Sequence, residues 1–299
     1  MPSDENPRGW LRTDTADYWR HARMYEPAQA FAHDPELTWL TVGDGTFGLD
    51  SIRIRNLGFR NALPTDIGDA LLRRAKESGM IDEYAQENAE SLSFADESFD
   101  LVFCKESYHH FPRPMLALYE MLRVARRAVM LIEPRDFVID HGPTRSTGPR
   151  KILSDLAVWI RDRRRVPHPP LAKEQLYVVS GEAGYEETGN YGYSISSREL
   201  EKVALGLDLP ALALKGLNDA FIPEGGFSLA EKDNPVFHEM KNAIEVADRK
   251  TDGGRSATSM LMAIIFKVPP ADEVRAFLDR HSWLIVDLPR NPYLSRSAD

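Results

Sequence analysis

The stretch that decides the fold runs from Thr38 to Gly48 and reads TWLTVGDGTFG. Its start is β-branched, aromatic and aliphatic, which predicts a short buried strand over 38–42. The residues Gly43–Gly48 then match the spacing G-x-G-x-x-G, and the following sequence predicts a helix over 48–57. Glycine is needed where a turn is tight and a ligand approaches the backbone closely. The stretch therefore predicts a strand, a ligand-binding turn and a helix.

Strands and helices keep alternating as far as residue 134. Apolar patterning predicts further strands over 61–65, 83–86, 99–104 and 128–132, with helices over 68–78 and 114–125 between them. The strand over 128–132 is almost wholly apolar, as expected for a strand buried on both faces of a parallel sheet. Such alternation is typical of a doubly wound, Rossmann-like α/β fold. We expect a mostly parallel, seven-stranded sheet with an antiparallel edge pair and helices on both faces.

The carboxylate of Asp66 lies at the predicted end of the second strand, where it can bind both hydroxyls of a ribose. The alternative is a helix cap, since Asp is favoured there too. The glycine turn and the carboxylate of Asp66 together indicate an adenosine-type cofactor, either NAD or S-adenosylmethionine. NAD needs a helix N-terminus facing its phosphates, whereas S-adenosylmethionine carries no phosphate. The long segment before the first strand, the stretch 88–100 and the late strands favour S-adenosylmethionine.

At this point the chain from Leu40 to about Pro134 resembles the class I S-adenosylmethionine-dependent methyltransferases, particularly the group acting on small molecules. The usual first motif of that family, V-G-C-G-T-G, is similar to Val42–Phe47 here. Thr41 departs from the family, because an acidic residue is common there, and Phe47 stands where a third glycine is usual. The other matching stretches are Thr65-Asp66-Ile67, Asn88–Phe94, Ser98–Val102, His109-His110-Phe111 and Glu120–Val124.

The resemblance implies a set of cofactor-binding residues. It places the methionine end of the cofactor beside the glycine turn and its ribose and adenine beside the ends of the second and third strands. Lys105 and Glu106 would lie at the mouth of the site, beyond the fourth strand. The residues implied for the cofactor are Gly43, Asp44, Gly45 and Thr46 in the turn, then Asp66, Ile67, Asn88, Ala89 and Glu90, together with Lys105.

Methyl transfer is an in-line displacement, so the main task of such an enzyme is to hold the acceptor close and aligned. A hydroxyl acceptor also needs a general base, for which histidine suits neutral pH. His109 and His110 follow the fourth strand, at the edge where such sheets bind ligands, and Glu106 is a further candidate. The alternatives are structural: the histidines would pack on the sheet or cap a helix, and Glu106 would pair with Lys105. His141 is a more distant candidate base.

The chain reads as one domain with a large insertion. We expect an N-terminal helical lid over 1–37, a cofactor-binding half over 38–135, an inserted acceptor-side cap over 136–195, and C-terminal helices and edge strands over 196–299. Within the cap, Tyr185, Tyr191 and Tyr193 suit stacking on a ring or sugar, or packing as a hairpin. Elements expected after the cap are a helix capped by Ser196 and Glu199, a helix beginning at Asn234-Pro235, strands over 211–217, 259–268 and 283–286, and a helix over 272–280.

Composition narrows the function further. The net charge is −9 without a long basic run, which disfavours nucleic acid as a partner. Cys104 is the single cysteine, no signal segment is apparent, and the longest apolar run, Met260–Phe266, is too short to span a bilayer. We therefore expect a cytoplasmic protein without a membrane span. The histidines are scattered, so no metal site is expected, and the sequence leaves open whether the chain forms a homodimer.

The sequence thus favours an S-adenosylmethionine-dependent methyltransferase acting on a small-molecule or glycan acceptor, with a hydroxyl as the expected target. One alternative is an NAD(P)-dependent oxidoreductase. Another is a module of the same fold that binds the cofactor but has lost its chemistry, an alternative that the unusual Thr41 and Phe47 keep open.

Overall fold

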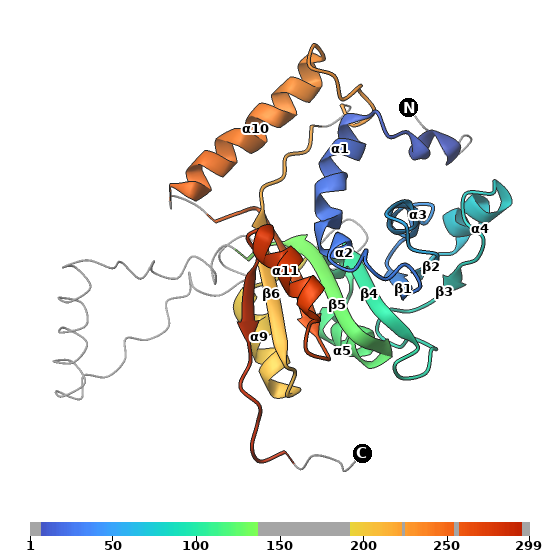
Figure 1. Ribbon diagram of the computed structural model, residues 1–299. Coiled ribbons are helices and arrows are strands. Elements are labelled where there is room, and N and C mark those ends of the chain that lie inside the picture. The colour runs from blue at the N-terminus through green and yellow to red at the C-terminus, as the bar shows by residue number, and fades with distance from the viewer. Residues whose placement is uncertain (1–6, 137–191, 223–224, 254–256, 295–299) are drawn as a thin grey trace, which may run out of the picture.

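The structure is a computed structural model, and it describes residues 7–136, 192–222, 225–253 and 257–294. A single sheet runs through the centre of the molecule, with helices on both of its faces (Figure 1). The strand order is β3-β2-β1-β4-β5-β7-β6-β8. This confirms the Rossmann-like α/β class predicted from the alternating pattern.

The first five strands are parallel and form the half of the sheet that carries the glycine turn. Neighbouring strands are β1 with β2 and β4, β2 with β3, and β4 with β5. Because all of them run in one direction, their carboxyl ends meet at one edge, where doubly wound sheets bind ligands. Their bounds are Thr38–Val42 for β1, Asn61–Asp66 for β2, Ala85–Gln86 for β3, Phe99–Lys105 for β4 and Ala125–Pro134 for β5.

The remaining strands are joined by antiparallel pairing. Strand β7, Met260–Phe266, lies between β5 and β6, Ala211–Leu217, and is antiparallel to both. Strand β8, Leu284–Asp287, pairs with β6 at the outer edge. The sheet therefore has eight strands where seven were expected, because the strand predicted over 283–286 pairs with β6 as a further edge strand.

Two layers of helices bury the two faces of the sheet. One face is covered by α5, Pro114–Val124, and α9, Ser197–Gly206. The other face is covered by α2, Glu26–Gln29, α3, Leu49–Asn56, and α11, Asp272–Arg280. Side chains alternate between these layers along each strand: in β4, Val102 and Cys104 face the first layer, whereas Leu101 and Phe103 face the second.

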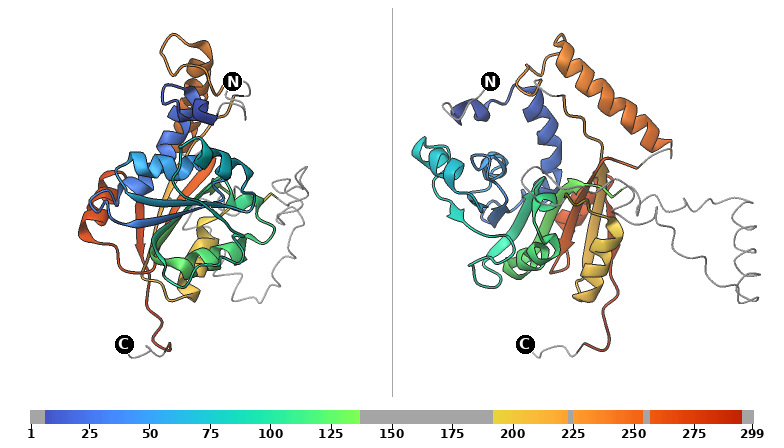
Figure 2. Two further views of the ribbon diagram at one scale, coloured as in Figure 1. Left: turned by 90° about the vertical axis from the view of Figure 1, so that its right-hand side faces the viewer. Right: turned by 180° about the vertical axis from the view of Figure 1, so that it is seen from behind.

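Three further helices complete the described structure. Helix α4, Ala70–Glu77, packs beside β2 around Leu72 and Ala75. Helix α1, Ala16–Ala22, lies above the carboxyl edge of the sheet, and α10, Pro235–Asp252, stands away from the sheet and contacts α1 (Figure 2). Short 3-10 turns occur at Pro7–Leu11 (η1), Arg23–Tyr25 (η2) and Tyr108–His110 (η3).

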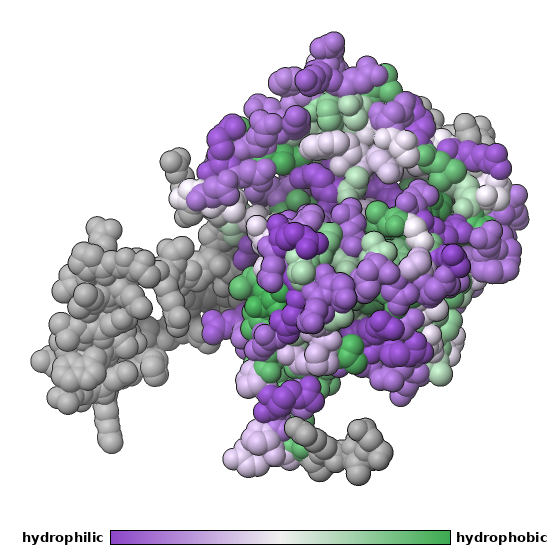
Figure 3. All heavy atoms as spheres, viewed as in Figure 1, coloured by the Kyte–Doolittle hydropathy of each residue, from purple (hydrophilic) through white to green (hydrophobic). Residues whose placement is uncertain are grey.

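Local signals in the sequence correctly mark several helix ends. Ser196 and Glu199 form a capping box at the start of α9, and the Asn234 side chain accepts from two backbone N–H groups at the start of α10. Within the N-terminal segment expected to be helical, η2 separates α1 from α2, and Pro27 lies in the first turn of α2, where its missing N–H costs nothing. None of the helices in the described ranges is both long and apolar enough to cross a bilayer. Polar and apolar side chains are interspersed over the surface in Figure 3.

Candidate functional site

The glycine turn between β1 and α3 packs tightly against two other segments. Gly43 has a φ of +76°, and a Cβ placed on it would lie 2.4 Å from the Cβ of Ser107, in the loop after β4. The Ser107 Oγ donates a hydrogen bond of 2.7 Å to the Gly43 carbonyl. A Cβ on Gly45 would lie 2.7 Å from the Asp66 carboxyl group. Glycine is therefore required at both positions, and the two most diagnostic features of the sequence meet at one place.

Asp44 holds this turn onto the helix that follows it. Its carboxylate is buried and accepts hydrogen bonds from the backbone N–H of Asp50 at 3.0 Å and of Ser51 at 2.9 Å. It also accepts from the Thr41 hydroxyl at 2.8 Å. Burial and the nearby charge of Asp50 raise the pKa of Asp44 well above its ordinary value, against these three hydrogen bonds. Asp44 is thus placed in the turn, with its carboxylate directed into the protein.

The ends of β2 and β3 bring the expected ribose and adenine residues to the same edge. Asp66 does not cap the next helix, because the N-cap residue of α4 is Asp69. Its Oδ1 accepts from the Gly68 N–H at 2.8 Å. Ile67 beside it is 68% exposed, which leaves apolar surface at this edge. Asn88 is exposed and Ala89 buried, both in the loop after β3.

Glu90, the third residue expected beside the adenine, is bonded to Arg113. It pairs with Arg113 just before α5, through an ion pair of 2.6 Å and a hydrogen bond of 2.6 Å from the Arg113 backbone N–H. The pair connects the loop after β3 to the start of α5. Glu90 therefore borders the expected adenine region while its carboxylate is engaged with Arg113.

A cavity of about 280 Å³ opens beside the glycine turn and is closed on one side by the N-terminal segment. The ring of His21, on α1, lies between two carboxylates: Nδ1 is 3.1 Å from Asp17 and Nε2 is 3.1 Å from Glu106. Helix α1 thus contacts the end of β4 through charged side chains. The residues that line the cavity are Trp10, Asp17, His21, Gly43, Asp44, Thr46, Leu49, Asp50, Arg53, Lys105, Glu106 and Ser107.

Lys105 and Glu106, at the end of β4, are paired with each other beside this cavity. The buried Lys105 Nζ is 3.0 Å from Glu106 and 3.6 Å from Asp50. Burial would lower the pKa of Lys105, but the charges of Asp50 and Glu106 outweigh it and raise that pKa. Burial likewise would raise the pKa of Glu106, yet Lys105, a hydrogen bond with His21 and the charge of Arg20 bring it well below its ordinary value. Both groups are therefore charged at neutral pH.

The predicted histidines lie in η3, where a buried carboxylate orients one of them. Glu133, at the end of β5, is fully buried and lies 2.6 Å from the Nδ1 of His109. Its other oxygen accepts from the backbone N–H groups of Ser107 and Tyr108, both at 3.0 Å. His110 is exposed, and its ring centroid is 3.9 Å from that of His109. The structure therefore gives His109 a fixed ring orientation.

A second cavity, of about 380 Å³, lies beside η3 and is lined by residues of η3, of the start of α5 and of the segment leading into α9. Tyr108 and Tyr193 both line it, and the Tyr193 backbone N–H donates to the His109 carbonyl at 3.1 Å. Ser107 and Tyr108 are consecutive, and each lines a different one of the two cavities. Tyr193, which was expected to contact the methyl acceptor, is therefore close to His109. The other expected cap residues, Tyr185 and Tyr191, and the candidate base His141 lie outside the described residues.

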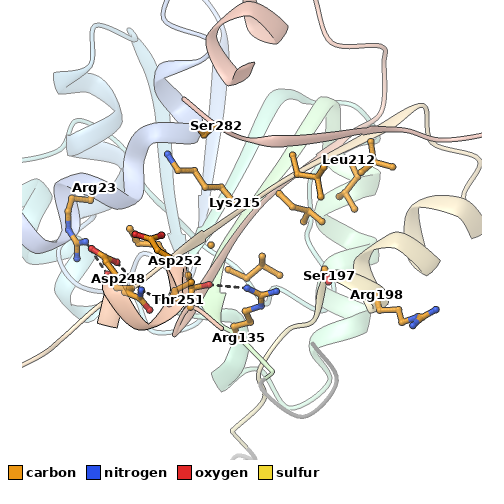
Figure 4. Close-up of a pocket in the computed structure, with 18 of the residues that line it drawn as sticks. Arg23, Arg135, Ser197, Arg198, Leu212, Lys215, Asp248, Thr251, Asp252 and Ser282 are labelled. Atoms are coloured by element: carbon orange, nitrogen blue, oxygen red, sulfur yellow. Dashed lines mark hydrogen bonds between the residues drawn. The ribbon is translucent and has the colours of Figure 1, made fainter. Parts of the chain in front are cut away.

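A larger groove, of about 1200 Å³, lies between α9, the end of α10 and the face of β6 and β8. Figure 4 shows Leu212 and several charged side chains, among them Arg135, that line this groove. Arg135 donates a hydrogen bond to Thr258 at 3.0 Å. Among the described residues, none of those expected from the sequence to bind the cofactor or act in catalysis lines it. We therefore place the candidate site at the glycine turn.

Several residues of this site were not identified from the sequence. They are Trp10, the α1 residues Asp17, Arg20 and His21, and the α3 residues Asp50 and Arg53. The spacing of Asp17 and His21, which places both on one face of a helix, was the one available signal. Nothing in the sequence indicated that this face would lie against the end of β4.

Residues 40–132 match the family model described as a methyltransferase domain. The match confirms the resemblance to class I S-adenosylmethionine-dependent methyltransferases over this segment, and with it S-adenosylmethionine as the cofactor that such a domain uses.

Two curated proteins are similar over the same part of the chain. A 2-methyl-6-phytyl-1,4-hydroquinone methyltransferase of Synechocystis is 34% identical over 101 residues, which cover 33% of this chain and 31% of that protein. The uncharacterized methyltransferase YcgJ of Bacillus subtilis is 26% identical over 122 residues, covering 40% of this chain and 46% of that protein. The chain thus spans less than half the length of each of these relatives.

Two solved structures are similar to the chain at low identity. A putative methyltransferase of Bacillus halodurans is 14% identical with a TM-score of 0.44, covering 81% of this chain and 99% of that chain. The YcgJ structure of Bacillus subtilis is 17% identical with a TM-score of 0.40, covering 81% of this chain and 96% of that chain. At such scores, the family relationship rests on the sequence match over residues 40–132.

Proposed function

We propose that the protein is an S-adenosylmethionine-dependent methyltransferase that acts on a small molecule. One observation carries the proposal: Gly45 of the turn lies against the carboxylate of Asp66, so that both motifs of the cofactor site converge at the carboxyl edge of the sheet. The site fits the cofactor chemically, because Asp66 offers a carboxylate for hydroxyl groups and the exposed Ile67 offers apolar surface for a purine. The residues that would hold the cofactor are Gly43, Gly45, Thr46, Asp66, Ile67, Asn88 and Ala89.

When bound, S-adenosylmethionine supplies an electrophilic methyl group. The contribution of the protein is positioning. Ser107 fixes the loop after β4 against Gly43, and Glu133 holds the backbone of that loop through two N–H groups. Rigid placement of this kind lowers the barrier of a bimolecular displacement, because the reactants need not find the aligned geometry by diffusion.

For the acceptor, we propose a hydroxyl-bearing small molecule bound in the cavity beside η3. The cavity is lined by Tyr108 and Tyr193, whose rings suit an aromatic or sugar acceptor. The name of the Synechocystis relative describes a hydroquinone substrate, which supports an aromatic hydroxyl compound here. His109 is the preferred general base for such a hydroxyl, because Glu133 at 2.6 Å from Nδ1 orients the ring and stabilises its protonated form.

Calorimetric titration with S-adenosylmethionine, S-adenosylhomocysteine and NADH tests the cofactor. Asp66→Asn should weaken binding of both sulfur compounds by roughly tenfold or more, since a charge-assisted hydrogen bond contributes about 1.5–3 kcal/mol. Asp82→Asn is a matched control, because Asp82 is a 91% exposed carboxylate that pairs with Arg55 and is not among the residues expected to hold the cofactor. Binding of NADH alone would favour the oxidoreductase, and cofactor binding without turnover of any hydroxyl acceptor would favour a module without chemistry.

The base is tested separately, once an acceptor is known. His109→Ala should reduce kcat about 100-fold or more and leave cofactor affinity unchanged, as general bases contribute roughly 10²–10⁴. His110→Ala serves as the control on the neighbouring ring. Equal turnover in the wild type and in both variants would exclude a role for either histidine as the base.

A further inference from the structure

The cavity beside η3 has an apolar lining that extends from the interior to the surface of α5. Tyr108, Ile195 and Leu200 line it and are buried. Met115 and Leu116, in the first turn of α5, also line it and remain 40% and 44% exposed. Large apolar side chains exposed next to one another are typical of a ligand-binding groove or an interface. The lining therefore offers an apolar path from the cavity onto α5.

The charged side chains of this lining are engaged by other residues of the protein. Arg113 forms an ion pair of 2.6 Å with Glu90. Glu199 accepts hydrogen bonds from the backbone N–H and the hydroxyl of Ser196, at 3.1 and 2.9 Å, in the capping box of α9. Burial of a further charge without a partner is costly, whereas burial of hydrocarbon is favourable. The cavity is therefore suited to an uncharged apolar group.

The hydroxyl of Tyr108 adds little polarity to the cavity. It donates to the Met115 sulfur at 3.2 Å, and a thioether is a weak acceptor. Burial, followed by the charge of Glu199, raises the pKa of Tyr108, so the phenol stays neutral at physiological pH. The ring of Phe111 lies edge-on to that of Tyr108, with 6.3 Å between centroids. Tyr108 thus presents mainly aromatic surface to a ligand.

The cavity adjoins the proposed reaction centre through the same short segment. Tyr108 lies between Ser107, which lines the cavity at the glycine turn, and His109, the proposed base. The Tyr193 backbone N–H donates to the His109 carbonyl at 3.1 Å, and Tyr193 lines the cavity beside η3. A head group at His109 can therefore extend a substituent into this cavity.

We propose that the cavity beside η3 and the exposed start of α5 bind a hydrocarbon tail of the acceptor. The acceptor is then an amphiphile, with its hydroxyl on a head group at His109 and an uncharged chain over Met115 and Leu116. The inference rests on the proposed function, because it names the substrate class of the same site. A volume of about 380 Å³ lies at the lower end of the range for small-molecule sites, so a longer chain would continue from the cavity onto α5.

Para-alkylphenols of increasing chain length test the tail directly, since their head group stays the same. Calorimetric titration with S-adenosylhomocysteine comes first and reports on the proposed function alone. Para-ethylphenol, para-butylphenol and para-hexylphenol are then titrated into the protein saturated with S-adenosylhomocysteine. Each methylene buried in the cavity should raise the affinity about fourfold, which corresponds to about 0.8 kcal/mol.

Leu116→Gln places a polar amide on the apolar path, at a position where its exposure should let the fold tolerate the change. The gain should fall to about twofold or less per methylene, while the affinity for para-ethylphenol falls by less than about threefold. Leu116→Met, which keeps an apolar side chain, should retain the dependence on chain length. Leu205→Gln is the matched control, because Leu205 on α9 is similarly exposed, at 37%, and does not line the cavity. It should also keep the wild-type dependence.

An affinity that does not rise with chain length, or a rise that Leu116→Gln leaves at its wild-type value, would overturn the inference. Binding of S-adenosylhomocysteine would in that case still support the proposed function. If Leu116→Gln abolished a dimer in light scattering, or binding to phosphatidylcholine vesicles, and left the dependence on chain length intact, the start of α5 would be an interface and the tail would again be refuted. If S-adenosylhomocysteine did not bind, the proposed function itself would fail, and the inference would fail with it.

Discussion

Replacement of Gly43 by alanine perturbs the glycine turn at its most confined position. The φ of Gly43 is +76°, in the left-handed region that costs a residue with a Cβ about 1–2 kcal/mol. The added methyl would also lie 2.4 Å from the Ser107 Cβ, closer than non-bonded carbon atoms can approach. Ser107 must therefore move, and its hydrogen bond of 2.7 Å to the Gly43 carbonyl would weaken or break.

The expected loss of stability follows from these contributions. Overpacking a close contact costs about 1–3 kcal/mol, and the lost hydrogen bond about 0.5–1.5 kcal/mol. Alanine gains about 0.4–1 kcal/mol from the lower entropy of its unfolded chain, which offsets part of the strain. We expect Gly43→Ala to lower the free energy of unfolding by about 1.5–6 kcal/mol, and to weaken S-adenosylhomocysteine binding because the loop after β4 is displaced.

Urea unfolding and calorimetry measure the two effects, with Gly79→Ala as the matched control. Gly79 has a similar φ of +68°, but a Cβ there would meet only the flexible end of Arg8 at 3.7 Å. This control should therefore lose about 1 kcal/mol from backbone strain alone. Ser107→Gly in the Gly43→Ala background removes the opposing Cβ and should recover the overpacking part. Equal destabilisation by Gly43→Ala and Gly79→Ala would refute the reasoning, because it would show that the contact with Ser107 does not resist the added methyl.

Three further predictions concern buried or paired groups near the site. Glu133→Gln should lower the free energy of unfolding by about 1–3 kcal/mol, since the amide replaces an acceptor oxygen of the buried carboxylate; an unchanged urea midpoint would contradict this. Glu106→Gln should destabilise the protein at pH 7 by about 1–3 kcal/mol, and the difference from wild type should shrink as the pH falls below the ordinary pKa of 4.5, because the folded-state pKa of Glu106 is lower. If the difference in the free energy of unfolding grew on acidification, the carboxylate of Glu106 would not be stabilised by its partners in the folded protein. Burial, followed by the charge of Glu133, raises the pKa of the Cys104 thiol, so a thiol reagent should label it in urea and not in the native protein; rapid native labelling would disprove its burial.

Much of the fold was predictable because its signals are local. The strand predicted over 38–42 and the one over 211–217 have these bounds in the structure, since each is an apolar run between turn residues. β5 begins at Ala125, before the predicted 128, because Arg126 and Arg127 continue the strand at the end of the sheet, where polar side chains reach solvent. An apolar pattern alone cannot mark that kind of strand end.

The charged part of the site could not be predicted in the same way. His21 and Glu106 meet because α1 lies above the carboxyl edge, which is a consequence of packing and not of any motif. Arg53 shares helix α3 with Arg55, and no local signal distinguishes them, yet one lines the cavity and the other pairs with Asp82. Their different surroundings arise from which face of the helix turns toward the N-terminal segment.

The carboxylates of this site divide into two groups by what their oxygens contact. Asp44 and Glu133 are buried, and their oxygens are bonded to groups of the turn and of the loop after β4, so they set the shape of these segments. Asp66 is only partly buried and accepts one local hydrogen bond, from Gly68, which leaves further acceptor capacity on its carboxylate. A carboxylate with remaining capacity at the edge of the sheet suits a ligand, whereas a saturated and buried one suits a scaffold. The sequence stretches that resemble the family contain a carboxylate of each kind, Asp44 and Asp66, and only the packing around each residue distinguishes them.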